Sequence, residues 1–243
     1  MLTDEYAKIL TEKIECIRST QRENIEKASQ LLKTVIENDG LIYVFGCGHS
    51  HMLSEEAFYR AGGLACVCPI FFEPLMLHES AALSSRLEKQ DGLYEKLLEN
   101  CSFSENDAVI CISNSGVNSV PVEFAAAVKA LGLPLIGIAS SRYLQQEPHN
   151  PLNAHLQQLC TVCIDNCAPH GDACLQIEKL PVKMTPVSTV TGAFILNSLL
   201  AEASALAAKE GFEVPVFLSG NIPGGSEYNR ALIEKYSKRV KYL

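Results

Sequence analysis

The chain has 243 residues, of which 47% are hydrophobic and 20% charged, a balance typical of a globular protein with a sizeable core. Its net charge of −8 argues against a nucleic-acid surface, since phosphate backbones attract clustered cations. We find no signal-peptide pattern and no apolar run of membrane-spanning length, so we expect a cytoplasmic protein that contacts neither nucleic acid nor membrane.

The first predicted element is one long helix over residues 4–38. Its apolar residues recur at helical spacing, and Asn38-Asp39-Gly40 supplies a stop. Strands and helices then alternate. Continuous apolar runs are typical of parallel strands covered on both faces, and we place strands at 41–45, 64–70, 107–112, 134–139 and 161–165.

Helical patterns follow these strands at about 50–61, 91–100, 118–131 and 150–159. Two more helices are predicted at 187–210, which is apolar nearly all round, and at about 227–239. The basic residues Lys235, Lys238, Arg239 and Lys241 are expected in the solvated last turns of the final helix. The alternation predicts a three-layer α/β/α sandwich in a single domain, with an N-terminal helix (1–40), an α/β core (41–211) and a C-terminal tail and helix (212–243).

Two of the predicted strands end in loops rich in glycine and serine. The first loop is Gly46-Cys47-Gly48-His49-Ser50, and the second is Ser113-Asn114-Ser115-Gly116, followed by Asn118 and Ser119. A loop of this kind at a helix N-terminus offers amides and hydroxyls to an anion, helped by the helix dipole. The two loops together predict a small phosphorylated ligand. The alternatives are a tight turn that needs glycine only for its backbone and a serine-rich helix cap.

Ten cysteines are expected to be reduced thiols, because a core of this size does not need disulfides. Cys160, Cys163, Cys167 and His170 have a spacing compatible with zinc. However, residues 161–165 also form a predicted strand, which sends neighbouring side chains to opposite faces, and no glycine helps a sharp turn there. We therefore expect no metal site. His170 is also predicted near the ligand side of the sheet.

In these motifs the chain resembles the sugar isomerase (SIS) domain family. The Ser-Asn-Ser-Gly loop after a Val-Ile-Cys-Ile strand resembles the family's phosphate-binding signature, and the Gly-Cys-Gly-His-Ser turn resembles the loop on the other side of the sugar. A third similar region comprises Asp165-Asn166, Gly171-Asp172-Ala173 and Thr185–Thr189, and it leads into the long helix. The similarity spans roughly residues 30–210 and is strongest to a bacterial phosphoheptose-isomerase-like group. It implies a flavodoxin-like five-stranded parallel sheet, a homodimer or homotetramer, a phosphosugar ligand and no organic cofactor.

The resemblance also implies which residues bind the ligand. Ser113 and Ser115 match the phosphate-binding serines, while Asn118 stands where the family usually has Ser or Thr, so that Ser119 is a substitute donor. The full predicted binding set is Gly46, Gly48, His49, Ser50, Ser113, Asn114, Ser115, Gly116, Asn118, Ser119, Ser188 and Thr189.

Aldose–ketose isomerisation needs a base that moves a proton between neighbouring carbons through an enediolate, and an acid that opens the sugar ring. The resemblance places a glutamate base either on the helix after the first loop or just after the second strand. We rank the adjacent pair Glu79 and His78 first, Glu55 and Glu56 next, and Glu73 last. The alternatives are acidic residues favouring a helix's first turns, for Glu55 and Glu56, and a solvated helix start, for His78 and Glu79.

The leading prediction is thus a sugar-phosphate isomerase. A non-catalytic phosphosugar sensor stays open, because one fold can serve regulation as well as catalysis. A lyase or etherase that acts on an amino-sugar phosphate also stays open, because the same base can begin an elimination.

Overall fold

The computed structural model describes residues 1–243, and a five-stranded parallel sheet lies at its centre. The strand order is β2-β1-β3-β4-β5. The strands are β1 (Ile42–Gly46), β2 (Val67–Pro69), β3 (Ala108–Ile112), β4 (Leu135–Ala139) and β5 (Val162–Asp165). This order confirms the predicted flavodoxin-like sheet. The strand order also reverses between β1 and β3. The carboxyl ends of these two strands therefore form the topological switch point, where ligands of such sheets bind.

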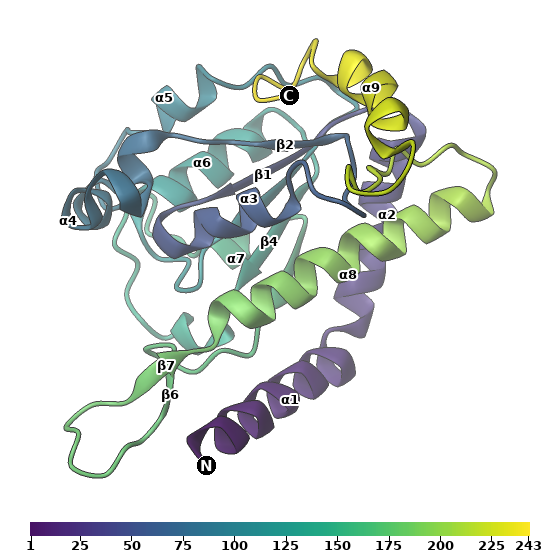
Figure 1. Cartoon of the computed structure of the whole chain (residues 1–243). Coiled ribbons are helices and arrows are strands. Elements are labelled where there is room, and N and C mark those ends of the chain that lie inside the picture. Colours follow the sequence, from purple (N-terminus) through teal and green to yellow (C-terminus); the bar gives the residue numbers. More distant parts are fainter.

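Helices cover both faces of the sheet, as Figure 1 shows, with α3 and α8 in front and α6 and α7 behind. The predicted three-layer sandwich is therefore confirmed. The helices are α1 (Leu2–Thr20), α2 (Arg22–Glu37), α3 (Met52–Ala57), α4 (Leu77–Leu87), α5 (Tyr94–Leu98), α6 (Ser119–Ala130), α7 (Leu156–Leu159), α8 (Ser188–Lys209) and α9 (Gly225–Tyr236). A small antiparallel pair, β6 (Ala173–Leu175) and β7 (Met184–Pro186), lies at the start of α8 (Figure 1).

One continuous hydrophobic core joins the sheet to its helices. The Phe45 ring on β1 lies 4.6 Å from the Phe124 ring on α6, centroid to centroid, and both side chains are buried. By length and composition α8 could span a membrane, but it packs against α2 and α3, as a core helix of a globular domain does. Strands buried on both faces explain why their sequences are continuously apolar.

The single helix predicted over 4–38 is wrong, because the chain breaks at Gln21 into α1 and α2. Just before the break, the Ser19 hydroxyl donates to the Glu15 carbonyl at 2.7 Å and the Thr20 hydroxyl to the Cys16 carbonyl at 2.8 Å. Such side-chain bonds compete with the helical hydrogen bonds and favour a bend. The periodicity of apolar residues continues across the break and therefore did not reveal it.

Three predicted helices are shorter than expected. The pattern at 50–61 yields a 3₁₀ turn over Gly48–His51 followed by α3, 91–100 yields only α5, and 150–159 yields only α7. Left-handed backbone at Tyr59, Gly92 and Asn153 excludes regular helix at these positions.

Helix α4 and the β6–β7 pair were not among the predicted elements, although the alternative interpretation of His78 and Glu79 as a solvated helix start agrees with the first turn of α4. Helix α4 contains Ser80 with φ −168° and ψ 111°, so its residues do not keep one helical register, which hides the periodicity. Strands of three residues, such as β6 and β7, are too short for a pattern to appear.

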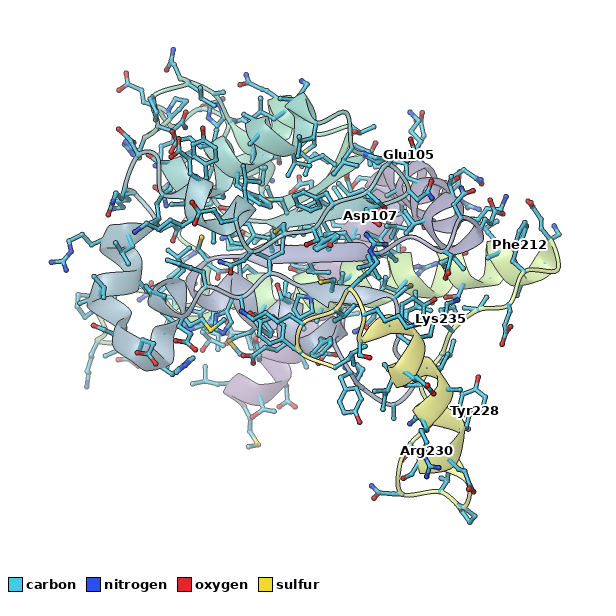
Figure 2. All side chains as sticks on the ribbon, turned by 90° about the horizontal axis from the view of Figure 1, so that it is seen from above. Glu105, Asp107, Phe212, Tyr228, Arg230 and Lys235 are labelled. Carbon is cyan, nitrogen blue, oxygen red and sulfur yellow. The ribbon has the colours of Figure 1, made fainter.

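The basic C-terminal residues are not all on a solvated helix. Helix α9 ends at Tyr236, and the Arg239 guanidinium beyond it lies 2.6 Å from the carboxylate of Asp107, whose side chain is fully buried. Asp107 also accepts hydrogen bonds from the amides of Leu41 and Ser104. Figure 2 shows the outer end of α9, with Tyr228 and Arg230, extending away from the sheet, while Lys235 lies at its inner end. The pair of Arg239 and Asp107 thus anchors the C-terminal segment to the core.

Candidate functional site

A small hollow at the carboxyl edge of the sheet brings together segments that are far apart in the sequence. It has a volume of about 20 Å³, which is about the space of a single water molecule. Any ligand larger than a water molecule would therefore have to extend beyond it, across the rim. The lining residues come from the first loop, the ends of β3, β4 and β5, and the start of α8; they are His49, Ser50, Leu53, Ile112, Asn114, Ile138, Asn166, Ser188, Thr189 and Gly192.

The second loop presents free backbone donors. The amides of Asn114 and Ser115 donate to no acceptor in the chain, and the Ser115 hydroxyl makes no hydrogen bond either. The loop is held in this shape by Gly116, which has a φ of +63° and whose amide donates to Ser113 Oγ at 3.2 Å. Successive free amides in a turn form a concavity that binds anions. This loop therefore has the geometry of a phosphate cradle.

Asn166 supports that loop from the end of β5. Its Nδ2 donates to Asn114 Oδ1 at 3.0 Å, and its own Oδ1 accepts from the Ala168 amide at 2.9 Å. Asn166 is 2% exposed, so its orientation is fixed by these bonds. It was not among the predicted binding residues, although the third motif of the sequence contains it.

The start of α8 is capped by Asp172. Its carboxylate accepts from the amides of Val187 and Ser188 at 3.0 and 2.8 Å, and from the Ser188 hydroxyl at 2.6 Å. Asp172 thereby occupies the positive end of the α8 dipole. Because the Ser188 hydroxyl donates its proton to Asp172, Ser188 lines the hollow without a free side-chain donor. Thr189 lines the hollow beside it.

The first loop depends on glycine for its backbone. A Cβ at Gly46 would lie 2.6 Å from the carbonyl of Ser50, and Gly48 has a φ of +54°. The two glycines therefore allow the tight turn that brings His49 and Ser50 to the hollow. At these two positions glycine is thus required by the backbone, as the alternative of a tight turn predicts.

At the start of α6, two of the predicted phosphate ligands hold other partners. Asn118 Nδ2 donates to Glu88 Oε1 at 2.9 Å, and the Ser119 hydroxyl lies 2.6 Å from Asp91 Oδ1. The Val120 amide also donates to the Glu88 carbonyl, at 3.0 Å. The N-terminus of α6 is thus covered by the segment after α4, and Ser119 is fully buried beneath it.

Glu88 is a further candidate for a catalytic carboxylate and was not among the predicted site residues. Its side chain is half-buried, and burial raises its pKa above the ordinary value, with the Asn118 hydrogen bond acting in the opposite direction. The Glu88 charge also contributes, after burial, to the raised pKa of the Cys47 thiol in the first loop. Glu88 follows α4, well beyond the stretch just after the second strand in which the family resemblance placed a base, so no signal in the sequence pointed to it.

The glutamates predicted to be catalytic lie outside the hollow. His78 Nε2 and Glu79 Oε1 are 3.7 Å apart, and both side chains are more than half exposed. Their helix, α4, nevertheless begins over the first loop, because Leu77 lies against Gly48. His78 and Glu79 are therefore at the rim of the site.

The remaining predicted carboxylates have their own partners. Glu55 pairs with His51 across 3.3 Å, and Glu56 pairs with Arg60 and accepts from Asn197 Nδ2 at 3.2 Å. Glu73 begins a 3₁₀ turn ahead of α4. None of them lines the hollow.

The cysteine cluster considered for zinc does not converge on one point. The sulfurs of Cys160 and Cys163 both lie against Gly137 on β4, whereas Cys167 Sγ lies 2.9 Å from Cys16 Sγ on α1. The His170 ring packs on Tyr143, with 4.6 Å between ring centroids. No group of three or more His, Cys, Asp or Glu side chains in the chain is arranged to hold a metal ion.

Residues 5–140 match the family model described as the SIS domain. The whole chain is 42% identical over 243 residues to a UPF0309 protein of Geobacillus thermodenitrificans, covering 98% of that protein. It is 43% identical over 244 residues to a UPF0309 protein of Halalkalibacterium halodurans, covering 97% of that protein.

Among solved structures, phosphoheptose isomerase GmhA from Neisseria gonorrhoeae is similar with a TM-score of 0.54 and 14% identity, over 84% of this chain and 100% of that chain. This likeness shows a shared fold. From the family match and from the full-length relatives it follows that the chain belongs to the SIS domain family and, within it, to the UPF0309 proteins.

Proposed function

We propose that this protein is a sugar-phosphate isomerase that interconverts an aldose phosphate and a ketose phosphate through an enediolate. The observation that carries the proposal is the pair of free amides of Asn114 and Ser115, which lies at the switch point of the sheet beside the first loop. A phosphate bound there accepts from both amides and from the Ser113 and Ser115 hydroxyls. Its charge is stabilised without a lysine or arginine, as is common at such loops.

The sugar extends from this phosphate toward the first loop and the start of α8. His49 and Ser50 offer polar groups on one side, and Asn114 and Thr189 on the other. His49 is exposed, so its ring is free to reorient toward a sugar oxygen. We assign His49 as the group that donates a proton to the ring oxygen or carbonyl oxygen.

Glu88 is our candidate for the base. It removes the proton from the carbon next to the carbonyl and returns it to the neighbouring carbon, while His49 and the substrate oxygens exchange the second proton. A carboxylate with a raised pKa is a better proton acceptor than an exposed one, and Asn118 holds Glu88 in place. Glu79 with His78, at the rim, is the competing assignment and is tested separately below.

The test is a panel of aldose and ketose monophosphates of three to seven carbons and their amino-sugar analogues, screened first by thermal shift. Binding to the native state alone raises the melting temperature. Each compound that binds is then followed by NMR for conversion to its isomer. Isomer formation supports the proposal.

Binding without any turnover identifies a sensor instead, and release of an unsaturated or cleaved product identifies a lyase. If no phosphosugar binds, the phosphate cradle at Asn114 and Ser115 is wrong as well.

A further inference from the structure

Two thiols that are distant in the sequence meet where α1 joins the body of the protein. Cys16 lies near the end of α1 and Cys167 just after β5, 151 residues apart, and their sulfurs are 2.9 Å from each other. This distance is shorter than the usual separation of unbonded sulfur atoms in contact. Cys16 is half-buried and accessible from solvent, whereas Cys167 is buried, with 8% exposure.

Hydrogen bonds on both sides hold the two cysteines in this position. The Asp165 amide donates to Gln21 Oε1 at 3.1 Å, which ties the end of β5 to the junction of α1 and α2. The Cys167 amide donates to Asp165 Oδ1 at 2.9 Å, in a backbone with a φ of +55°. Hydrogen bonds at the α1–α2 junction and after β5 thus keep the two sulfurs close together.

Helix α1 has few other attachments to the body. Ile17 is its only buried residue, and near its start the Tyr6 hydroxyl donates to the Pro186 carbonyl at 2.8 Å. Figure 1 shows α1 projecting below the sheet with the N-terminus at its far end. A covalent bond at Cys16 would therefore fasten an element that is otherwise weakly held.

We propose that Cys16 and Cys167 form a reversible disulfide when the protein meets a peroxide. The Cys16 thiol reduces hydrogen peroxide, giving a sulfenic acid and one water. The Cys167 sulfur then attacks the Cys16 sulfur, the S–O bond breaks, and the hydroxyl leaves with the Cys167 proton as a second water. Two thiols and one peroxide thus give one disulfide and two waters, and a dithiol reductant reverses the reaction.

The order of the two steps follows from the surroundings of each thiol. Burial, and then the adjacent Cys16, raise the pKa of Cys167 to about 12, so Cys167 is a poor first target for peroxide. Cys16, which is more accessible, reacts first and brings an electrophilic sulfur to its partner. Disulfides of this kind in reducing compartments are usually transient and sense oxidants.

The other thiol contact in this region is less suited to a cross-link. Cys160 and Cys163 are separated by only two residues, one after α7 and one on β5, and a disulfide would have to bend the start of a strand that is paired with β4. Cys16 and Cys167 belong to separate segments, so a disulfide between them does not require a paired strand to bend. The proposed bond would also join α1 to Cys167, the residue next to Asn166, and Asn166 lines the hollow.

The experiment uses the full-length protein, reduced and then treated with stoichiometric hydrogen peroxide. Free thiols are alkylated, and peptides are mapped without reduction. We expect one cross-linked peptide pair containing Cys16 and Cys167. We also expect a melting temperature raised by roughly 5 °C or more, since the bond closes a long loop of the unfolded chain, and both changes should reverse with dithiothreitol.

Cys16→Ser and Cys167→Ser should each abolish the cross-link and the temperature shift, while Cys174→Ser, at another half-buried cysteine near α1, should leave both unchanged. Should either of the first two variants fold poorly, the peptide map of the wild-type protein still decides. A bond between Cys160 and Cys163, an intermolecular bond, or oxidation of Cys16 to sulfinic acid without a cross-link would each overturn the proposal. None of these outcomes depends on the proposed isomerase activity.

Discussion

Asn118 Nδ2 donates to Glu88 Oε1 at 2.9 Å, which joins the first residues of α6 to the segment that follows α4. Asp91 makes the parallel contact with Ser119. The N-terminus of a helix stabilises negative charge, and in this chain two of its own carboxylates occupy the end of α6. These two carboxylates engage the side-chain donors of Asn118 and Ser119, so the proposed phosphate site uses the free amides of the second loop instead.

If Glu88 is the base, Glu88→Gln should remove turnover while sparing binding. Glutamine keeps the shape of the side chain and an oxygen that accepts from Asn118, but it cannot take a proton. We expect kcat to fall by about 10²–10⁴-fold, with the phosphosugar dissociation constant changed less than about threefold. Steady-state kinetics and calorimetry measure the two quantities.

Glu79→Gln is the matched control, because Glu79 lies at the rim and is exposed. It should retain most of the activity. A loss of turnover in Glu79→Gln together with full activity in Glu88→Gln would move the base to Glu79.

Glu88 should also make stability depend on pH. Burial raises its pKa in the folded state, so the folded protein binds this proton more tightly than the unfolded chain does. Between the ordinary pKa of glutamate and the raised value, the contribution of Glu88 to the free energy of unfolding falls as pH increases, and it stays low at neutral pH. Glu88→Gln should lose this dependence.

Urea unfolding at pH 4 and at pH 7 measures the effect in both proteins. From pH 4 to pH 7, the contribution of residue 88 to the free energy of unfolding should fall in the wild type but not in Glu88→Gln. Relative to the wild type, the variant should therefore be more stable at pH 7 than at pH 4. A shift in the opposite direction would mean that Asn118 and the helix dipole outweigh burial.

The two predicted serines on either side of Gly116 should behave differently. The Ser115 hydroxyl has no partner in the chain, so Ser115→Ala should weaken phosphosugar binding by about tenfold, the loss of one hydrogen bond to a charged group, with little effect on stability. Ser119 is buried against Asp91, so Ser119→Ala should cost roughly 1–2 kcal/mol of unfolding free energy. Thermal denaturation with and without ligand separates the two effects, and equal losses of affinity in both variants would contradict the assignment.

The sheet was predictable because its strands are buried on both faces. Runs such as Val109–Ile112 on β3 must be apolar throughout, and the alternation with helical patterns identifies parallel crossovers. The break at Gln21 was not predictable from periodicity, since Ile17 and Ile25 keep helical spacing on either side of it. Helix α4 was hidden by the extended backbone of Ser80.

The site was predictable only in part, because the sequence indicates its loops but not the side-chain contacts between them. Glycine and serine at the ends of β1 and β3 indicate a tight turn and free donors from sequence alone, and the structure places His49, Ser50 and Asn114 around one hollow. Side-chain partners are set by tertiary contacts, which local spacing does not encode. Glu88 meets Asn118 across 30 residues, so this contact had no signature in the sequence.

The first loop offers a test that separates backbone geometry from ligand contact. A methyl group at Gly46 would lie 2.6 Å from the Ser50 carbonyl, and backbone atoms cannot give way as a flexible side chain does. Gly46→Ala should therefore cost about 2–4 kcal/mol, or a drop in melting temperature of roughly 5–15 °C, and should displace His49 and Ser50. Gly220→Ala is the control, because that position is exposed and the nearest atom is 3.7 Å away, so the change should stay within about 0.5 kcal/mol. If Gly46→Ala melted like the wild type yet lost phosphosugar binding, the glycine would be required by the ligand rather than by the turn.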